Sequence, residues 1–212
     1  MKDHDLLIER LSQSARPVKR PLPPGWRVLV WASLALPCGA VAGLLARRAL
    51  TDWSQSGALW AGIQLTLSLL MSVLAMRSAF TMSIAGRRGT GWKAFLPLTA
   101  IWLAVSLVNM PTDKLSTSIA EGSGCYLFLV MVSAPMAAIM IAIMRRTLSL
   151  YPVRSLAMAG FGVSWMAMSL LAFCHPVHFH LHDLAMHLAA SMTTVALTVV
   201  AGRRWVAIRP FP

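Results

Sequence analysis

The sequence predicts an all-α integral membrane protein, a bundle of six transmembrane helices with both termini in the cytoplasm. Three observations lead to this fold class. The 212 residues are 57% hydrophobic and 12% charged, which is more apolar than a soluble domain of this size. Several runs of about 20 apolar residues are long enough to cross a bilayer. Sixteen of the 19 Lys and Arg residues fall on one side of these runs, and the positive-inside rule makes that side cytoplasmic.

Residues 1–26 form the only sizeable polar segment and are expected to be a cytoplasmic tail that binds a partner. Acidic residues come first and basic residues last, an order that suits the dipole of a short helix. Leu7 and Leu11 lie one turn apart and give this helix an apolar side. Because a helix of about 10 residues is marginal in water, we expect it to order on a partner or on a membrane surface.

The prolines that follow are expected to keep residues 16–25 extended and to exclude a helix. Three basic residues in this stretch are available for an acidic partner surface or for lipid headgroups. They are Arg16, Lys19 and Arg20.

The transmembrane domain is expected to fill residues 27–205, followed by a short cytoplasmic tail at 206–212. Six spans at about 30 residues each leave no room for a separate folded domain. A cleaved signal peptide is not expected, because the first 26 residues lack an apolar core. The predicted spans are 28–45, 58–76, 94–108, 124–144, 156–173 and 184–201.

Residues 174–187 concentrate the reactive side chains, since they contain five of the six histidines and one of the three cysteines. With the predicted topology they face outward. Cys125 begins the fourth span and Cys174 ends the fifth, both at the outer face. The two cysteines are therefore expected either to form a disulfide, if their Cα atoms approach within about 7 Å, or to share a thiophilic metal. The alternative is that they are small buried apolar residues, which is also the expectation for Cys38 inside the first span.

The histidines favour metal binding or pH sensing. His178, His180 and His182 alternate, so in an extended loop they would share one side, as in a metal-binding tract or a solvated, pH-responsive loop. His187 lies about one turn inside the last span, where a polar group is usually functional, although it also suits a hydrogen bond to a neighbouring helix. The candidate metal ligands are Cys125, Cys174, His175, His178 and His187.

The sequence lacks the motifs of several other classes of protein. There is no phosphate-binding glycine loop, no nucleophile elbow and no dinucleotide-binding fingerprint, so no enzymatic activity and no obligatory cofactor are expected. The net charge of +12 lies in the short flanks of apolar runs, which favours a membrane rather than nucleic acid as the partner. Within the spans there is no deep carboxylate and few polar groups, which argues against a proton-coupled transporter.

Several short motifs follow one another along the chain: residues 6–11 and 16–24 in the amino-terminal tail, residues 83–87 between the second and third spans, and the cysteines and histidines of the outer face. Their order resembles that of the NrsF-type anti-sigma factors, six-helix proteins of the bacterial inner membrane. Residues 6–11 and 16–24 are similar to the leucines and the Pro-Val-Arg-Arg-Leu-x-Pro-Pro stretch at the amino terminus of that family. Residues 83–87, Ser-Ile-Ala-Gly-Arg, resemble its Ser-Val-Pro-Gly-Arg loop, with Ala85 in place of the proline.

The outer face continues the resemblance to the family. Cys125 is similar to its cysteine before the fourth span. Cys174-His175-Pro176 resembles its second cysteine in a Cys-Pro motif, with a histidine inserted, and His187 is similar to its later histidine. The resemblance covers nearly the whole chain, although the additional histidines of the loop depart from it.

This resemblance implies a membrane-bound regulator of transcription that holds an extracytoplasmic-function sigma factor at the cytoplasmic face. A metal or an oxidant sensed at the outer cysteines, and at histidines near them, would release the sigma factor in a stress response. The alternative interpretation is a small metal- or haem-linked membrane transporter or electron carrier that uses the histidines as ligands.

Overall fold

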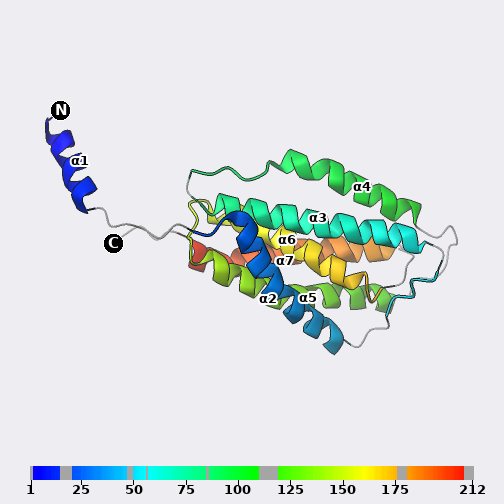
Figure 1. Cartoon of the computed structure of the whole chain (residues 1–212). Helices are drawn as coiled ribbons and strands as arrows, with labels where there is room; N and C mark the ends of the chain where they lie inside the picture. Colours follow the sequence, from blue (N-terminus) through cyan, green and yellow to red (C-terminus); the bar gives the residue numbers. More distant parts are fainter. Residues whose placement is uncertain are drawn as a thin grey trace.

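The computed structural model describes residues 2–14, 21–46, 50–55, 57–84, 86–109, 119–175 and 181–207. These residues form α-helices joined by turns and short loops, with one short 3-10 helix, η1, and no strand, so the all-α prediction is confirmed for them (Figure 1). The helices are α1 (Lys2–Ser14), α2 (Pro24–Leu45), α3 (Ala58–Met82), η1 (Trp92–Ala94), α4 (Phe95–Val108), α5 (Ile119–Met144), α6 (Pro152–Leu171) and α7 (Leu181–Val206).

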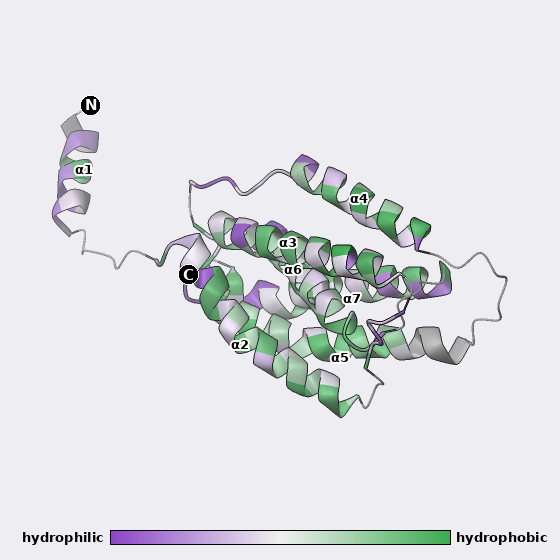
Figure 2. Cartoon of the chain, turned by 45° about the vertical axis from the view of Figure 1, so that its right-hand side comes forward, coloured by the Kyte–Doolittle hydropathy of each residue, from purple (hydrophilic) through white to green (hydrophobic). Residues whose placement is uncertain are grey.

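Four of the described helices are long and apolar enough to cross a membrane, namely α2, α3, α5 from Gly124 onward, and α7. The apolar helix α4 is shorter, and α6 is not one of these four helices. Hydrophobic residues cover long stretches of the helices, while polar residues gather toward their ends (Figure 2). This is the distribution of a membrane protein. All six predicted spans coincide with helices α2 to α7.

Helix α6 is the centre of the bundle, because it packs against α3, α5 and α7. More than half of its residues are buried. It is therefore surrounded largely by other helices of the bundle. Two glycines allow the close approach: a Cβ on Gly160 would lie 2.8 Å from the Cα of Val195 in α7, and one on Gly162 would lie 3.1 Å from Met76 in α3.

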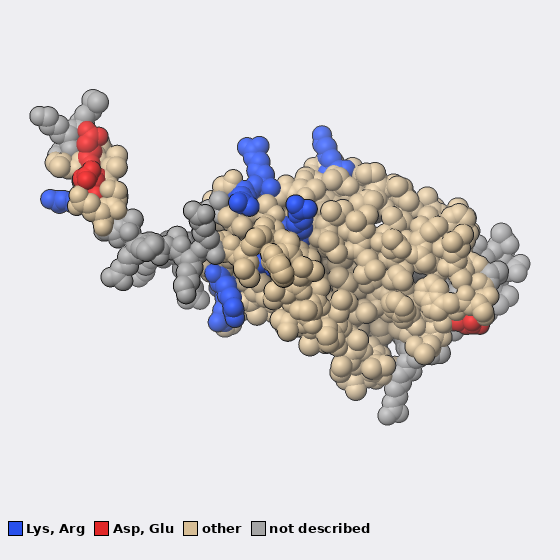
Figure 3. Space-filling view, viewed as in Figure 1, with Lys and Arg blue, Asp and Glu red and all other residues tan. Residues whose placement is uncertain are grey.

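The two ends of the bundle differ in chemistry. At one end, here called the basic end, α2 and α6 begin and α3, α5 and α7 finish (Figure 1). The N–H of Ser149, in the α5–α6 turn, donates to the carbonyl of Val206 at 2.8 Å and ties this turn to the last residue of α7. Described Lys and Arg side chains gather toward this end (Figure 3). The opposite end, here called the histidine end, is where α6 finishes and α7 begins.

Arg27 joins three helices at the basic end. Its guanidinium donates to the carbonyl of Phe80 at 3.3 Å, to the hydroxyl of Ser83 at 2.9 Å and to the hydroxyl of Thr147 at 2.9 Å. It also lies 4.4 Å from the centroid of the Phe80 ring. The side chain is only 4% exposed, so these contacts offset the cost of burying its charge. The start of α2 is thereby attached to the ends of α3 and α5.

Helix α1 stands apart from the bundle (Figure 1). Its residues Leu6, Leu7 and Ile8 are all more than half exposed. The prediction of an extended stretch through residue 25 was wrong at its end, because Pro24 and Gly25 form the first turn of α2. A proline is compatible with that position, since the first helical N–H has no partner within the helix.

Several other helices extend beyond the predicted spans, and two of these extensions change where a predicted residue lies. Helix α3 continues to Met82, so Arg77 belongs to this helix rather than to a loop. Helix α7 begins at Leu181, so His182 lies on a helix and the expected extended run of alternating histidines was wrong at that residue. His178 and His180 lie outside the described residues.

Candidate metal centre

Three potential metal ligands, Cys125, His175 and His187, come together at the histidine end of the bundle and are here called the centre. Cys125 lies in the first half of α5, and its side chain is 3% exposed. Burial of a thiol is favourable by itself, because cysteine behaves as a small apolar residue. Cys125 differs from a simple packing residue in its neighbours, which are two imidazoles rather than aliphatic side chains alone.

His175 enters the centre from the turn that follows α6. The chain reverses there through hydrogen bonds from the N–H of Phe173 to the carbonyl of Leu170 at 3.2 Å and from the N–H of Cys174 to the carbonyl of Leu171 at 2.9 Å. This tight turn directs the His175 side chain back into the bundle, where it is 5% exposed.

Thr51, in the connection between α2 and α3, holds this turn in place. Its N–H donates to the carbonyl of Phe173 at 3.0 Å. Its Oγ1 lies 2.8 Å from the carbonyl oxygens of both Ala172 and His175, and it accepts the N–H of His175 at 3.1 Å. Thr51 therefore fixes the backbone that carries the His175 imidazole, as an outer-shell residue does for a metal ligand.

The loop that carries Thr51 is shaped by its next residue. Oδ1 of Asp52 accepts the N–H of Ser54 at 3.0 Å and its hydroxyl at 2.6 Å, a turn of the Asx type. These hydrogen bonds, the side-chain one first, lower the pKa of the exposed Asp52 carboxyl below its ordinary value. The carboxylate that shapes the loop is therefore ionised at neutral pH.

His187 completes the group from α7, where it is 1% exposed and so lies fully within the bundle. The expectation that it sits inside the last helix is confirmed. The helix itself fixes its backbone, and its carbonyl accepts a hydrogen bond from the Ser191 hydroxyl at 2.9 Å.

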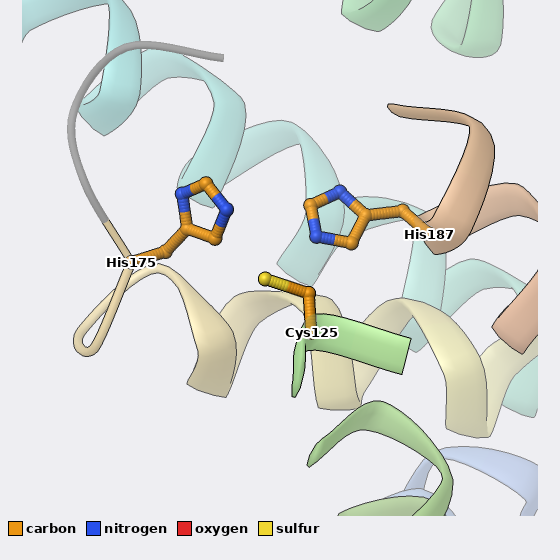
Figure 4. Close-up of side chains that lie close together, drawn as sticks. All are labelled: Cys125, His175 and His187. Carbon is orange, nitrogen blue, oxygen red and sulfur yellow. The ribbon is translucent and has the colours of Figure 1, made fainter. Parts of the chain in front are cut away.

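Three potential ligand atoms converge at this point, one each from Cys125, His175 and His187, and all lie within 4.8 Å of one another. The two imidazole rings are 5.3 Å apart between centroids and inclined by 63°. The Cys125 sulfur points toward the space beside both rings (Figure 4). Three segments far apart in the sequence thus present their donor atoms to one small volume.

This donor set suits a transition metal. One thiolate and two imidazoles are typical ligands of zinc and of other borderline or soft ions, whereas calcium and magnesium require oxygen ligands. Tetrahedral bonds of about 2.0–2.3 Å place ligand atoms roughly 3.4–3.7 Å apart. The side chains would therefore contract by about 1 Å around an ion.

A cavity of about 30 Å³ adjoins the two imidazoles. It has room for one or two water-sized groups. Its wall combines apolar residues with polar ones from the α2–α3 connection and from α3. The polar wall consists of Thr51, Gln64, Ser68, His175 and His187.

The remaining predicted site residues lie elsewhere. Cys174 is half-buried and lines a separate groove of about 290 Å³ between α2, α5 and α6, with its sulfur 3.9 Å from the carbonyl of Leu170. No disulfide joins Cys125 to Cys174. Cys38 is exposed on α2, and its neighbour Gly39 makes the close helix contact that was expected of the cysteine.

Leu7 is described on α1 and is 56% exposed. The structure does not describe the side chains of the other predicted partner-binding residues or of one predicted metal ligand. The side chain of Leu11 and the residues Arg16, Lys19, Arg20 and His178 lie outside the described part of the chain.

Sequence reasoning missed two residues of the site. Gln64 carried a usable signal, because an amide inside an apolar span is rare and usually has a role. Thr51 carried none, since a threonine in a short polar connection is unremarkable until the turn it holds is known.

Comparisons of the chain with protein-family models, with curated proteins and with solved structures find no match. Its function is therefore inferred from the residues of this chain.

Proposed function

We propose that the protein is a membrane-bound anti-sigma factor, a regulator without catalytic activity. In this proposal α1 and the basic stretch after it hold an extracytoplasmic-function sigma factor, and a metal ion at Cys125, His175 and His187 is the signal for release. The observation that carries it is the convergence of these three buried ligands at one end of the bundle. The motif resemblance to NrsF-type anti-sigma factors supplies the class of partner.

The proposed placement is the inner membrane of a bacterium, with six spans and both termini cytoplasmic. The gathering of Lys and Arg toward the basic end supports this orientation under the positive-inside rule. It puts α1 and the partner on the cytoplasmic side and the metal centre on the outer side, where a signal from outside the cell arrives.

Helix α1 has the properties of a partner-binding element. Leu6, Leu7 and Ile8 are exposed and have few contacts within a helix of 13 residues. A helix of this length gains most of its stability from burying an apolar face on another surface. A groove on a partner would provide that surface.

The contacts between the two ends give the signal a physical route. Metal binding would draw α5, α7 and the end of α6 together at the histidine end. Helix α7 runs unbroken for 26 residues to the basic end, where Val206 is bonded to Ser149. Thr147, which lies two residues before Ser149 in the α5–α6 turn, accepts a hydrogen bond from Arg27 at the start of α2, next to the tail. The signal acts only if the metal binds the holding and releasing states with different affinity.

The alternative of a haem protein has less support. The centroids of the His175 and His187 rings are 5.3 Å apart, too close for a porphyrin held between them. The adjoining cavity of about 30 Å³ is also roughly tenfold smaller than the pockets that hold cofactors, which span about 300–1,000 Å³.

A transport function would require polar groups within the spans. The prediction of few such groups was wrong for α3, because Gln64, Ser68 and Ser72 form a buried row along this helix. Hydrogen bonds occupy this row: Gln64 donates to Ser106 at 2.8 Å, Ser68 to the backbone of Gln64 at 2.7 Å and Ser72 to the backbone of Gly162 at 2.8 Å. The row therefore fits helix packing better than an ion path.

The test of partner binding is co-purification of the tagged full-length protein with the sigma factors of its host. We expect capture by the unaltered protein and by Ser12→Asp, which adds a charge about 140° around α1 from Leu7. Leu7→Asp should abolish capture, because it places a carboxylate on the apolar face. Equal capture by both variants would remove α1 from the binding surface.

The test of signalling repeats this co-purification after addition of zinc or cadmium. We expect the unaltered protein and Cys38→Ser to release the sigma factor, and Cys125→Ser to retain it. Retention by all three would keep the anti-sigma function and refute the metal signal. Absence of any captured sigma factor would refute the proposed function.

A further inference from the structure

Among the residues that the structure describes, three ligands converge at the centre, one fewer than the four that a zinc-class ion prefers. A closed structural zinc site uses four protein ligands, whereas a site with three keeps one position for an exchangeable molecule. Both His175 and His187 line the cavity of about 30 Å³, which adjoins the centre and has room for one or two water molecules.

Gln64 shares that cavity. It lies in the second turn of α3 and is 5% exposed. A buried amide is costly in an apolar span unless its polar atoms are used. Gln64 lines the same small cavity as the two imidazoles.

The orientation of the Gln64 amide follows from its neighbour. The hydroxyl of Ser106 donates its single proton to the carbonyl of Trp102 at 2.8 Å. It can therefore only accept from Gln64, whose Nε2 lies 2.8 Å away. One N–H of the amide is used in this bond, and the carbonyl oxygen and the second N–H remain for a molecule in the cavity.

We propose that Cys125, His175 and His187 hold a divalent ion of the zinc class in tetrahedral coordination, and that Gln64 binds the fourth ligand. That ligand is one exchangeable small molecule, either water or a small anion. The inference rests on the proposed metal role of these three residues and is independent of the sigma factor. Gln64 is a binding residue for the exchangeable ligand, not a ligand of the ion.

The size of the cavity gives this site its selectivity. A water molecule or a linear anion such as azide fits the space, whereas an imidazole ring does not. Small anions should therefore bind to the ion, and larger donors should be excluded although they are good ligands in solution.

The experiment uses the purified full-length protein in detergent, loaded with cobalt(II) as a coloured substitute for zinc. We expect a thiolate-to-cobalt charge-transfer band and the strong visible bands of tetrahedral cobalt. Azide should shift the visible bands, and imidazole at the same concentration should not.

Two variants test the role of Gln64. Gln64→Leu keeps the size of the side chain and should retain the charge-transfer band, while azide affinity falls by about tenfold through loss of a hydrogen bond. Ser72→Ala, two turns further along the same side of α3, is the matched control and should bind azide as the unaltered protein does.

Each result has one meaning. Absence of the charge-transfer band in the unaltered protein refutes the metal centre, whether or not a sigma factor is captured. A band that does not respond to azide refutes the open fourth position alone. Equal azide affinity in Gln64→Leu and the unaltered protein refutes the role of Gln64, and displacement of the bands by imidazole refutes the size limit.

Discussion

Replacement of Thr51 by valine tests whether the α2–α3 connection builds the metal centre. Valine has nearly the same shape as threonine but lacks the hydroxyl. The change removes the acceptor of the His175 N–H at 3.1 Å and the donor to the carbonyls of Ala172 and His175, both at 2.8 Å. The backbone bond from the Thr51 N–H to Phe173 remains.

The size of the effect follows from these contacts. One lost acceptor and one lost donor, at about 0.5–1.5 kcal/mol each, sum to about 1–3 kcal/mol. If the turn then samples positions in which the His175 ring leaves the centre, this free energy appears as a loss of metal affinity of roughly 5- to 150-fold. Outer-shell substitutions at metal sites typically cost about 10- to 100-fold, in the same range.

The assay is a competition titration of zinc between the purified protein and a chromophoric chelator. Thr51→Ser keeps the hydroxyl and should bind zinc within a few-fold of the unaltered protein. Thr66→Val is the matched control, because its hydroxyl donates to the carbonyl of Gly62 within its own helix at 2.9 Å. Unchanged zinc affinity in Thr51→Val, or an equal loss in Thr66→Val, would refute the assignment of Thr51 as a positioning residue.

Two further predictions concern the bundle, both measured by thermal unfolding in detergent. Gly160→Ala should lower the free energy of unfolding by about 1–3 kcal/mol, because the new Cβ would lie 2.8 Å from the backbone of Val195. The control is Gly62→Ala, whose Cβ would meet no atom within 4 Å and which should be neutral or slightly stabilising. Equal effects would show that α6 and α7 are not in close contact. Arg27→Lys should lower the free energy of unfolding by about 2–4 kcal/mol, since one lysine amine cannot contact the hydroxyls of Ser83 and Thr147 and the Phe80 ring together. The control is Arg204→Lys at an exposed position, which should change it by less than about 0.5 kcal/mol. An Arg27→Lys protein as stable as the Arg204→Lys protein would contradict the role of Arg27 in joining α2 to α3 and α5.

The sequence by itself was sufficient to predict the helices. Each predicted span falls on a helix, because a run of apolar residues long enough to cross a bilayer is a local property of the chain. The boundaries at Pro24 and Met82 were less accurate, because composition does not change sharply where a helix leaves the apolar layer.

The sequence also located the reactive residues but not their grouping. It placed Cys125, Cys174, His175 and His187 at one end, since all four lie at the same ends of predicted spans. It favoured the two cysteines as the central pair. Only the tertiary structure sets His175 and His187 beside Cys125, while Cys174 lines a different groove.

The reason is geometric. Depth in a membrane follows from position along a span, but the neighbours of a side chain depend on how each helix is rotated, and one residue changes that direction by about 100°. Cys174 and His175 lie in the turn after α6, where the backbone that Thr51 holds directs the two side chains to different surroundings. The roles of Thr51 and Gln64 depend in the same way on the packing of all the helices, which decides the turn that Thr51 holds and the cavity that Gln64 lines.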